Sequence, residues 1–96
     1  MSDAVERSLA RCRALREAGD VQGAVSVALL TVQMAPQCAV AWSALGAGLL
    51  ALGQPVGAVE AFRQSAAIEE SPGRQADLGL ALWRAGDIAA AEGAFQ

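Results

Sequence analysis

Three glycines recur at a nearly constant interval along this chain of 96 residues. Each follows an alanine or a leucine, and the step from Gly19 to Gly53 is almost equal to the step from Gly53 to Gly86. Other columns share this register: Ala24, Ala58 and Ala91; Ala28, Phe62 and Phe95; Leu15, Leu49 and Leu82; and Leu45-Gly46 with Leu78-Gly79. A constant interval is typical of chains in which one supersecondary unit stacks on copies of itself. We therefore predict one domain, residues 1–96, with repeats at about 5–38, 39–71 and 72–96, the third truncated.

The first repeat is predicted to hold two helices, because β-branched alternation is scarce and helix-stop signals divide it. Asp3 and Glu6 have the spacing of a capping box, which predicts a helix from there to about Ala18. Gly19 ends that helix, and Asp20 is placed to cap a second one that runs to about Ala35. Pro36 prevents the second helix from continuing.

The other two repeats follow the same plan. In the second, helices are expected from about Cys38 to Leu52 and from Pro55, at a first-turn position, to about Glu69. In the third, a helix opens at Ser71-Pro72 and a turn is expected at Gly86-Asp87, followed by a further helix. The prediction is an all-α protein of about six helices without strands.

The repeated columns resemble those of the tetratricopeptide repeat. The second repeat carries the resemblance best, with Trp42, Leu45, Gly46, Leu49, Ala58 and Phe62 at the family's spacings. The third repeat has Gln75 in place of the tryptophan, and the first has Ser8, Arg11 and Cys12 where the family has tryptophan, leucine and glycine. The resemblance implies antiparallel helix pairs stacked into a right-handed α-solenoid.

Small residues in the repeat are expected to let helix axes approach closely. Glycine within a helix costs about 1 kcal/mol relative to alanine, so Gly46 and Gly79 indicate close packing. The same is expected of Ala24, Ala58 and Ala91, with Leu45, Leu49, Phe62, Leu78 and Leu82 filling the space beside them.

The resemblance also implies a binding surface, because the first helix of each repeat lines the concave face of such a superhelix. The inward positions of the family correspond to Leu9, Arg13, Arg16, Ser43, Ala47, Leu50, Ala76, Leu80 and Trp83. The third repeat supports this assignment from its own pattern. Leu78, Leu82 and Ala85 form a stripe suited to the core, and Ala76, Leu80 and Trp83 form a separate one.

Plainer interpretations of these residues stay open. Trp83 is either an anchor for a ligand or a residue buried by intramolecular or self-association contacts. Arg13 and Arg16 are either groove residues or solvated cations, with Arg13 and Glu17 at the spacing of an i, i+4 ion pair. The family's clamp for chaperone tails is disfavoured, because Arg13 alone among its matching positions, Leu9, Arg13, Ala44, Gly73 and Asp77, has a suitable side chain.

Composition disfavours several classes of function. The net charge of −3 provides no basic field for nucleic acid. The chain has no histidine, which excludes Ser-His and Cys-His nucleophile pairs, and its glycines match neither a P-loop nor a dinucleotide fingerprint. We expect no enzyme activity within these residues, no cofactor and no metal site. Cys12 and Cys38 lack metal-ligand spacing and are expected to be reduced thiols in a cytoplasmic protein, with a disulfide between them as the alternative.

The longest uncharged segment is not expected to enter a membrane. No charged residue lies between Asp20 and Glu60, but Pro36 and Pro55 bracket an apolar piece shorter than the roughly 20 residues that a spanning helix needs.

The sequence thus predicts a non-catalytic module that binds an apolar or amphipathic segment of a protein or peptide on its concave face. Two alternatives remain. The chain is the amino-terminal, substrate-recruiting part of a larger modifying enzyme, such as a transferase or hydroxylase, or it assembles with copies of itself through the open third repeat.

Overall fold

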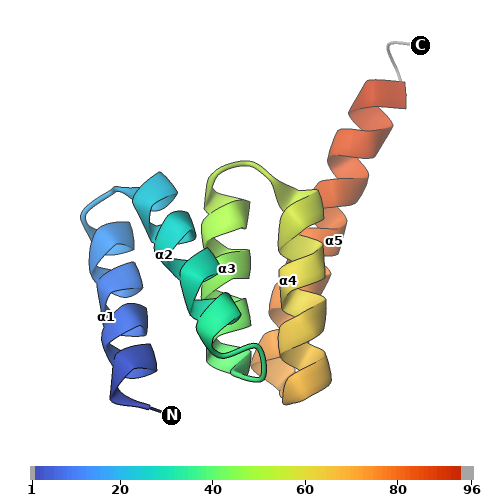
Figure 1. The fold of residues 1–96 in the computed structure, drawn as a ribbon. Helices are drawn as coiled ribbons and strands as arrows, with labels where there is room; N and C mark the ends of the chain where they lie inside the picture. Colours follow the sequence, from blue (N-terminus) through green and yellow to red (C-terminus); the bar gives the residue numbers. More distant parts are fainter. Residues whose placement is uncertain (1, 94–96) are drawn as a thin grey trace.

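The chain forms five helices that pack in the order in which they occur along it. The computed structural model describes the backbone of residues 2–93 and the side chains of residues 2–87. The helices are α1 (Asp3–Glu17), α2 (Val21–Met34), α3 (Ala39–Ala51), α4 (Pro55–Ile68) and α5 (Pro72–Gly93). Figure 1 shows α1 to α4 side by side, with α5 packed behind α4 and running past it. No strand occurs in residues 2–93, which confirms the all-α prediction.

Local sequence signals set most of the helix ends. Gly19 and Gly53 have positive φ values of 89° and 77°, which turns the chain after α1 and after α3. Asp20 caps α2, its Oδ1 accepting a hydrogen bond of 2.9 Å from the Gly23 amide. Pro55 is the first residue of α4, as expected. These four ends confirm the helix boundaries predicted from the same residues.

The cap of α1 differs from the prediction. Ser2, not Asp3, is the N-cap, and its Oγ accepts a hydrogen bond of 3.3 Å from the Val5 amide. Asp3 is the first helical residue, and its negative charge near the positive end of the helix dipole stabilises the helix. Serine is as good a cap as aspartate, so the helix starts one residue earlier than the Asp3–Glu6 spacing indicated.

The turn expected at Gly86-Asp87 is absent, and α5 continues through it to Gly93. Gly86 lies within α5 and has a helical φ. Among the described residues, the glycines with a positive φ are Gly19 and Gly53. A glycine inside a helix costs only about 1 kcal/mol, so it does not stop a helix unless the chain gains contacts by turning back. The described chain therefore has five helices where about six were predicted. Ala91 lies beyond the described side chains, and Phe95 lies beyond the described residues.

Each helix packs against the next, and α1 also touches α3. This arrangement is consistent with a helical repeat. One core cluster joins α1, α2 and α3 around Cys12, Val32 and Leu45 and includes Ala61 of α4. A second joins α3, α4 and α5 around Phe62 and its neighbours. No helix in the described part of the chain is both long enough and apolar enough to cross a bilayer.

Close packing of small residues is confirmed in the second repeat but not in the third. A Cβ built on Gly46 would lie 2.7 Å from Cε1 of the buried Phe62 ring, so only glycine lets α4 approach α3 there. Gly48, which was not predicted to have a packing role, is equally close to Val25 of α2. Gly79 has no atom within 4 Å of the same built position. The prediction that Gly79 brings helices together is therefore wrong for this structure.

Candidate binding groove

One stripe of α3 connects three hollows on the surface. Val40, Ser43, Ala47 and Leu50 recur every three or four residues and so lie along one side of the helix. Val40 lines two of the hollows, Ser43 and Ala47 line the central one, and Leu50 lines the third. At 1.5 Å per residue the stripe is about 15 Å long. We call this stripe with its hollows the α3 groove.

The central hollow, of about 270 Å³, has opposite charges at its edges. Arg16 from α1 and Asp77 from α5 line it together with Val40, Ser43, Ala44 and Ala47. In the part of the chain that the structure describes, the single ion pair joins Arg74 and Glu69. The guanidinium of Arg16 and the carboxylate of Asp77 are thus available to a bound segment.

The hollow at the carboxyl-terminal end of α3 is about 330 Å³ and largely apolar. Leu50, Gly53 and Pro55 form one side, and Trp83, Arg84 and Asp87 of α5 form the other. Trp83 is 66% exposed. Tryptophan and arginine, which both line this hollow, are residue types enriched at binding hot spots.

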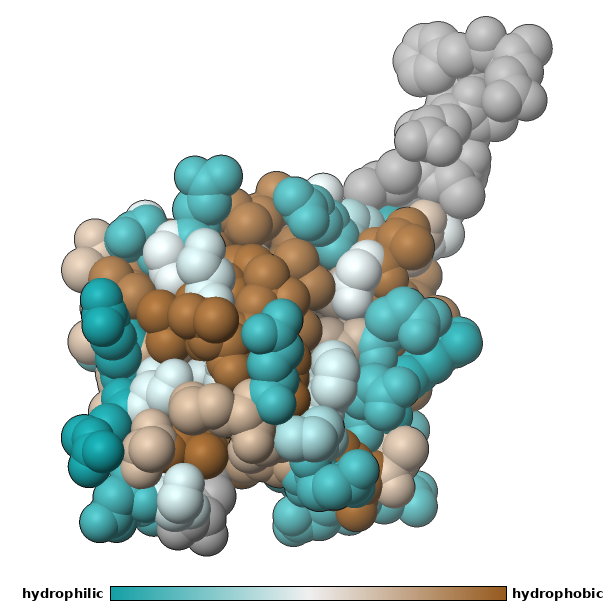
Figure 2. Space-filling view, viewed as in Figure 1, coloured by the Kyte–Doolittle hydropathy of each residue, from teal (hydrophilic) through white to brown (hydrophobic). Residues whose placement is uncertain are grey.

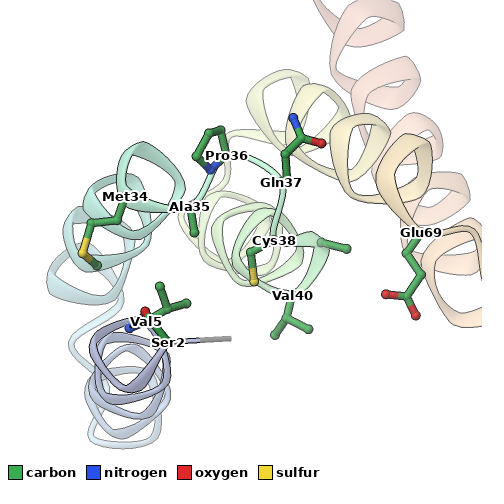
Figure 3. Close-up of a pocket in the computed structure, with 10 residues that line it drawn as sticks. Ser2, Val5, Met34, Ala35, Pro36, Gln37, Cys38, Val40 and Glu69 are labelled. Atoms are coloured by element: carbon green, nitrogen blue, oxygen red, sulfur yellow. Dashed lines mark hydrogen bonds between the residues drawn. The ribbon is translucent and has the colours of Figure 1, made fainter.

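The hollow at the amino-terminal end of α3 is the largest of these three, about 530 Å³, and was not predicted. Figure 3 shows Val5 of α1, Cys38 at the N-cap of α3 and Val40 of α3 around its centre, with Met34 and Glu69 at opposite edges. Its residues come from helix ends of different repeats, so the repeat pattern offered no signal for it.

The structure brings together part of the predicted binding set. Arg16, Ser43 and Ala47 meet in the central hollow, and Leu50 and Trp83 meet in the apolar one. The remaining predicted residues lie outside the described hollows: Leu9 is half-buried against the first core cluster, and Arg13, Ala76 and Leu80 are exposed. Arg13 forms no ion pair with Glu17 within the described residues.

The hydroxyl of Ser43 has a structural partner. It lies 2.6 Å from Oγ of Ser65, a fully buried residue of α4 that donates to the Ala39 carbonyl at 2.8 Å. Nε of Arg74 also donates to the Ser65 oxygen, at 3.0 Å. These bonds tie α3, α4 and α5 together, so the Ser43 hydroxyl holds the groove wall in place.

A second hydroxyl pair occupies the equivalent place in the first repeat. Ser8 of α1 lies beside buried Thr31 of α2, whose Oγ1 donates to the Val27 carbonyl at 2.7 Å. The step from Thr31 to Ser65 along the chain equals the step from Gly19 to Gly53, so the two hydroxyls share the repeat register. The repeat register therefore contains a signal for these two buried hydroxyls.

The buried stripe of α5 is shifted from the predicted one. Ala81 is fully buried, with Leu78 and Ala85 packed beside it, whereas Leu82 is 43% exposed. The prediction matched Leu82 to Leu49, but α5 packs mainly on α4 and buries the side that faces it. Leu80, Leu82 and Trp83 are all exposed as a result.

An exposed apolar surface on α2 also escaped prediction. Figure 2 shows apolar side chains gathered over α2 and α3, and Leu29, Leu30 and Met34 of α2 are among the exposed large residues. The signal for it was the uncharged run between Asp20 and Glu60, which was considered only as a possible membrane span.

The two cysteines form no disulfide. Cys12 is buried between α1 and α2, and its Sγ donates to the Ala24 carbonyl at 3.3 Å. Burial raises the pKa of the Cys12 thiol, and the nearby positive charge of Arg16 opposes that shift. The described residues contain no group of histidine, cysteine and carboxylate side chains that could hold a metal ion.

Sequence comparisons assign the chain to no known group: no protein-family model matches it, and no curated protein matches it.

Proposed function

We propose that the protein is a non-catalytic interaction module of tetratricopeptide type, which acts in the cytoplasm and binds a segment of another protein in the α3 groove. The observation that carries this proposal is the unbroken stripe of α3 that joins three hollows. A stripe about 15 Å long has the length of about five extended residues, or of about three helical turns. The groove thus suits a short peptide segment better than a compact small molecule.

The partner segment is amphipathic. Its apolar anchor enters the hollow between Leu50 and Trp83, where burial of one large aliphatic side chain contributes about 1.5–3 kcal/mol. An acidic residue of the same segment pairs with Arg16 at the central hollow. Asp77, on the other side of that hollow, disfavours a segment that is acidic throughout.

A random peptide library displayed on phage is a suitable probe, because no ligand has to be assumed. Selected peptides are synthesised and titrated against the protein and its variants by isothermal calorimetry. Trp83→Ala and Leu50→Glu are expected to weaken binding at least tenfold. Leu30→Glu is the matched control, since it places the same charge on an exposed leucine that lines none of the described hollows.

Two arginines of α1 test whether positive charge at the central hollow contributes to peptide binding. Arg16→Glu is expected to weaken binding of the selected peptides, whereas Arg13→Glu, on the same helix but outside the described hollows, leaves it unchanged. The far-ultraviolet circular dichroism spectrum of each variant serves to check that it is folded. If folded Trp83→Ala binds the selected peptides with unchanged affinity, the proposal that they bind in the α3 groove is refuted. Loss of binding in Leu30→Glu alone would assign the ligand to the surface of α2.

A further inference from the structure

The outer side of α5 is an uncovered helix face with an unusual composition. Gly79, Leu82 and Gly86 lie at i, i+3 and i+7 and so share one side of the helix. Neither glycine has an atom within 4 Å of a built Cβ, and Leu82 is 43% exposed. Two glycines and an exposed leucine on one side of a helix form a flat surface that another helix can approach closely.

The second repeat shows which kind of segment covers such a face. The residues of α3 that lie one repeat earlier, Gly46 and Leu49, are covered by α4. The Phe62 ring lies over Gly46, and a Cβ built on Gly57 would lie 3.3 Å from Cδ1 of Leu49. The covering helix therefore presents a small residue to the leucine and, five positions later, an aromatic ring to the glycine.

The chain contains one more segment with that pattern. The step along the chain from Gly46 to Gly79 also leads from Gly57 to Ala90 and from Phe62 to Phe95. Ala91 likewise corresponds to Ala58, which is fully buried in α4. Residues 88–96 thus have the side-chain pattern that the face of Gly79 and Leu82 requires.

The described part of α5 does not fold back over this face. Because α5 runs without a turn to Gly93, residue 93 lies about 21 Å along the helix axis from Gly79. Figure 1 shows α5 extending past the other helices rather than folding back. A straight helix cannot pack against its own side.

We propose that two copies of the chain exchange these segments. Residues 88–96 of each copy cover the Gly79, Leu82 and Gly86 face of the other, so that Phe95 lies over Gly79 as Phe62 lies over Gly46. The arrangement is reciprocal and closes as a two-fold dimer. It requires no new type of contact, since α3 and α4 already make the same one within a single chain.

Gly79→Ala tests the exchange in the whole chain. In one copy alone the added methyl group meets nothing within 4 Å and favours the helix, so the variant folds. In the dimer the methyl group would meet the Phe95 ring about as closely as one on Gly46 would meet Phe62, at 2.7 Å. Gly73→Ala is the matched control, because it adds the same group to α5 with its nearest contact at 3.9 Å.

Sedimentation equilibrium across a concentration series is the measurement. We expect the unaltered protein to dimerise, Gly79→Ala and Phe95→Ala each to raise the dimer dissociation constant at least tenfold, and Gly73→Ala to leave it unchanged. A protein that is monomeric at every concentration would overturn the proposal. A dimer that neither variant weakens would overturn it too. If the protein is monomeric and Gly79→Ala lowers its stability, then residues 88–96 cover the Gly79 face within the same molecule. That outcome would exclude exchange between two copies.

Discussion

Replacing Gly53 and Gly86 by alanine should change stability in opposite directions, although both glycines belong to the same column of the repeat. Gly53 has a φ of 77° and turns the chain between α3 and α4, where its amide donates to the Leu50 carbonyl at 3.1 Å. Gly86 is an internal residue of α5 with a helical φ. In a single copy of the chain neither built Cβ has a neighbour within 4 Å, so the backbone alone decides both effects as long as the protein is monomeric.

The expected magnitudes follow from the two conformations. Alanine in the left-handed conformation costs about 1–2 kcal/mol, so Gly53→Ala should lose that much stability. Alanine in a helix is about 1 kcal/mol better than glycine, so Gly86→Ala should gain that much. The two variants should therefore differ by about 2–3 kcal/mol. For a domain of this size each kcal/mol corresponds to about 4–8 °C in Tm.

Urea denaturation at a protein concentration low enough for the chain to be monomeric, followed by far-ultraviolet circular dichroism, measures the difference. Gly19→Ala is an internal reference, because Gly19 has a φ of 89° and is equally open around its built Cβ. It should lose as much stability as Gly53→Ala. If Gly86→Ala is instead destabilised to the same extent as Gly19→Ala, then Gly86 turns the chain and the continuous α5 is wrong.

Two further predictions concern buried polar groups. Ser65→Ala should destabilise the protein by about 1–3 kcal/mol in the same assay, because Arg74 and Ser43 lose a buried partner, whereas Gln64→Ala on the surface should have little effect. For Cys12, the raised pKa means that the unfolded chain ionises first, so stability should fall as pH rises above the ordinary thiol value of 9.0. Cys12→Ala should remove that decline, and an equal decline in the variant would contradict the assignment.

Helix ends were predictable wherever one residue determines the backbone by itself. Pro36 and Pro55 restrict the chain by covalent geometry, and Asp20 caps a helix with its own side chain. The cap of α1 was missed because Ser2 and Asp3 are both suitable and adjacent. Such competition within one residue of a helix end is the ordinary limit of local signals.

The candidate groove was predictable in its middle and not at its ends. Ser43, Ala47 and Leu50 share a face of α3 by helical periodicity alone, so their alignment followed once the helix was recognised. The contributions of α1 and α5 depend on how those helices cross α3, which no periodicity encodes. Arg16 therefore reaches the groove whereas Arg13 and Ala76 do not, and the hollow around Val5 and Cys38 was missed.

By itself, the sequence determined that this protein is helical, where four of its helices begin or end, and which glycine lets α4 approach α3. These properties depend on local backbone preferences and on a side-chain pattern that recurs at a nearly constant step along the chain. Only the tertiary structure decided that Gly53 turns the chain while Gly86 does not, and that Ala81 rather than Leu82 is buried. The reason is physical: glycine permits both a helix and a turn, and the packing of neighbouring helices selects between them.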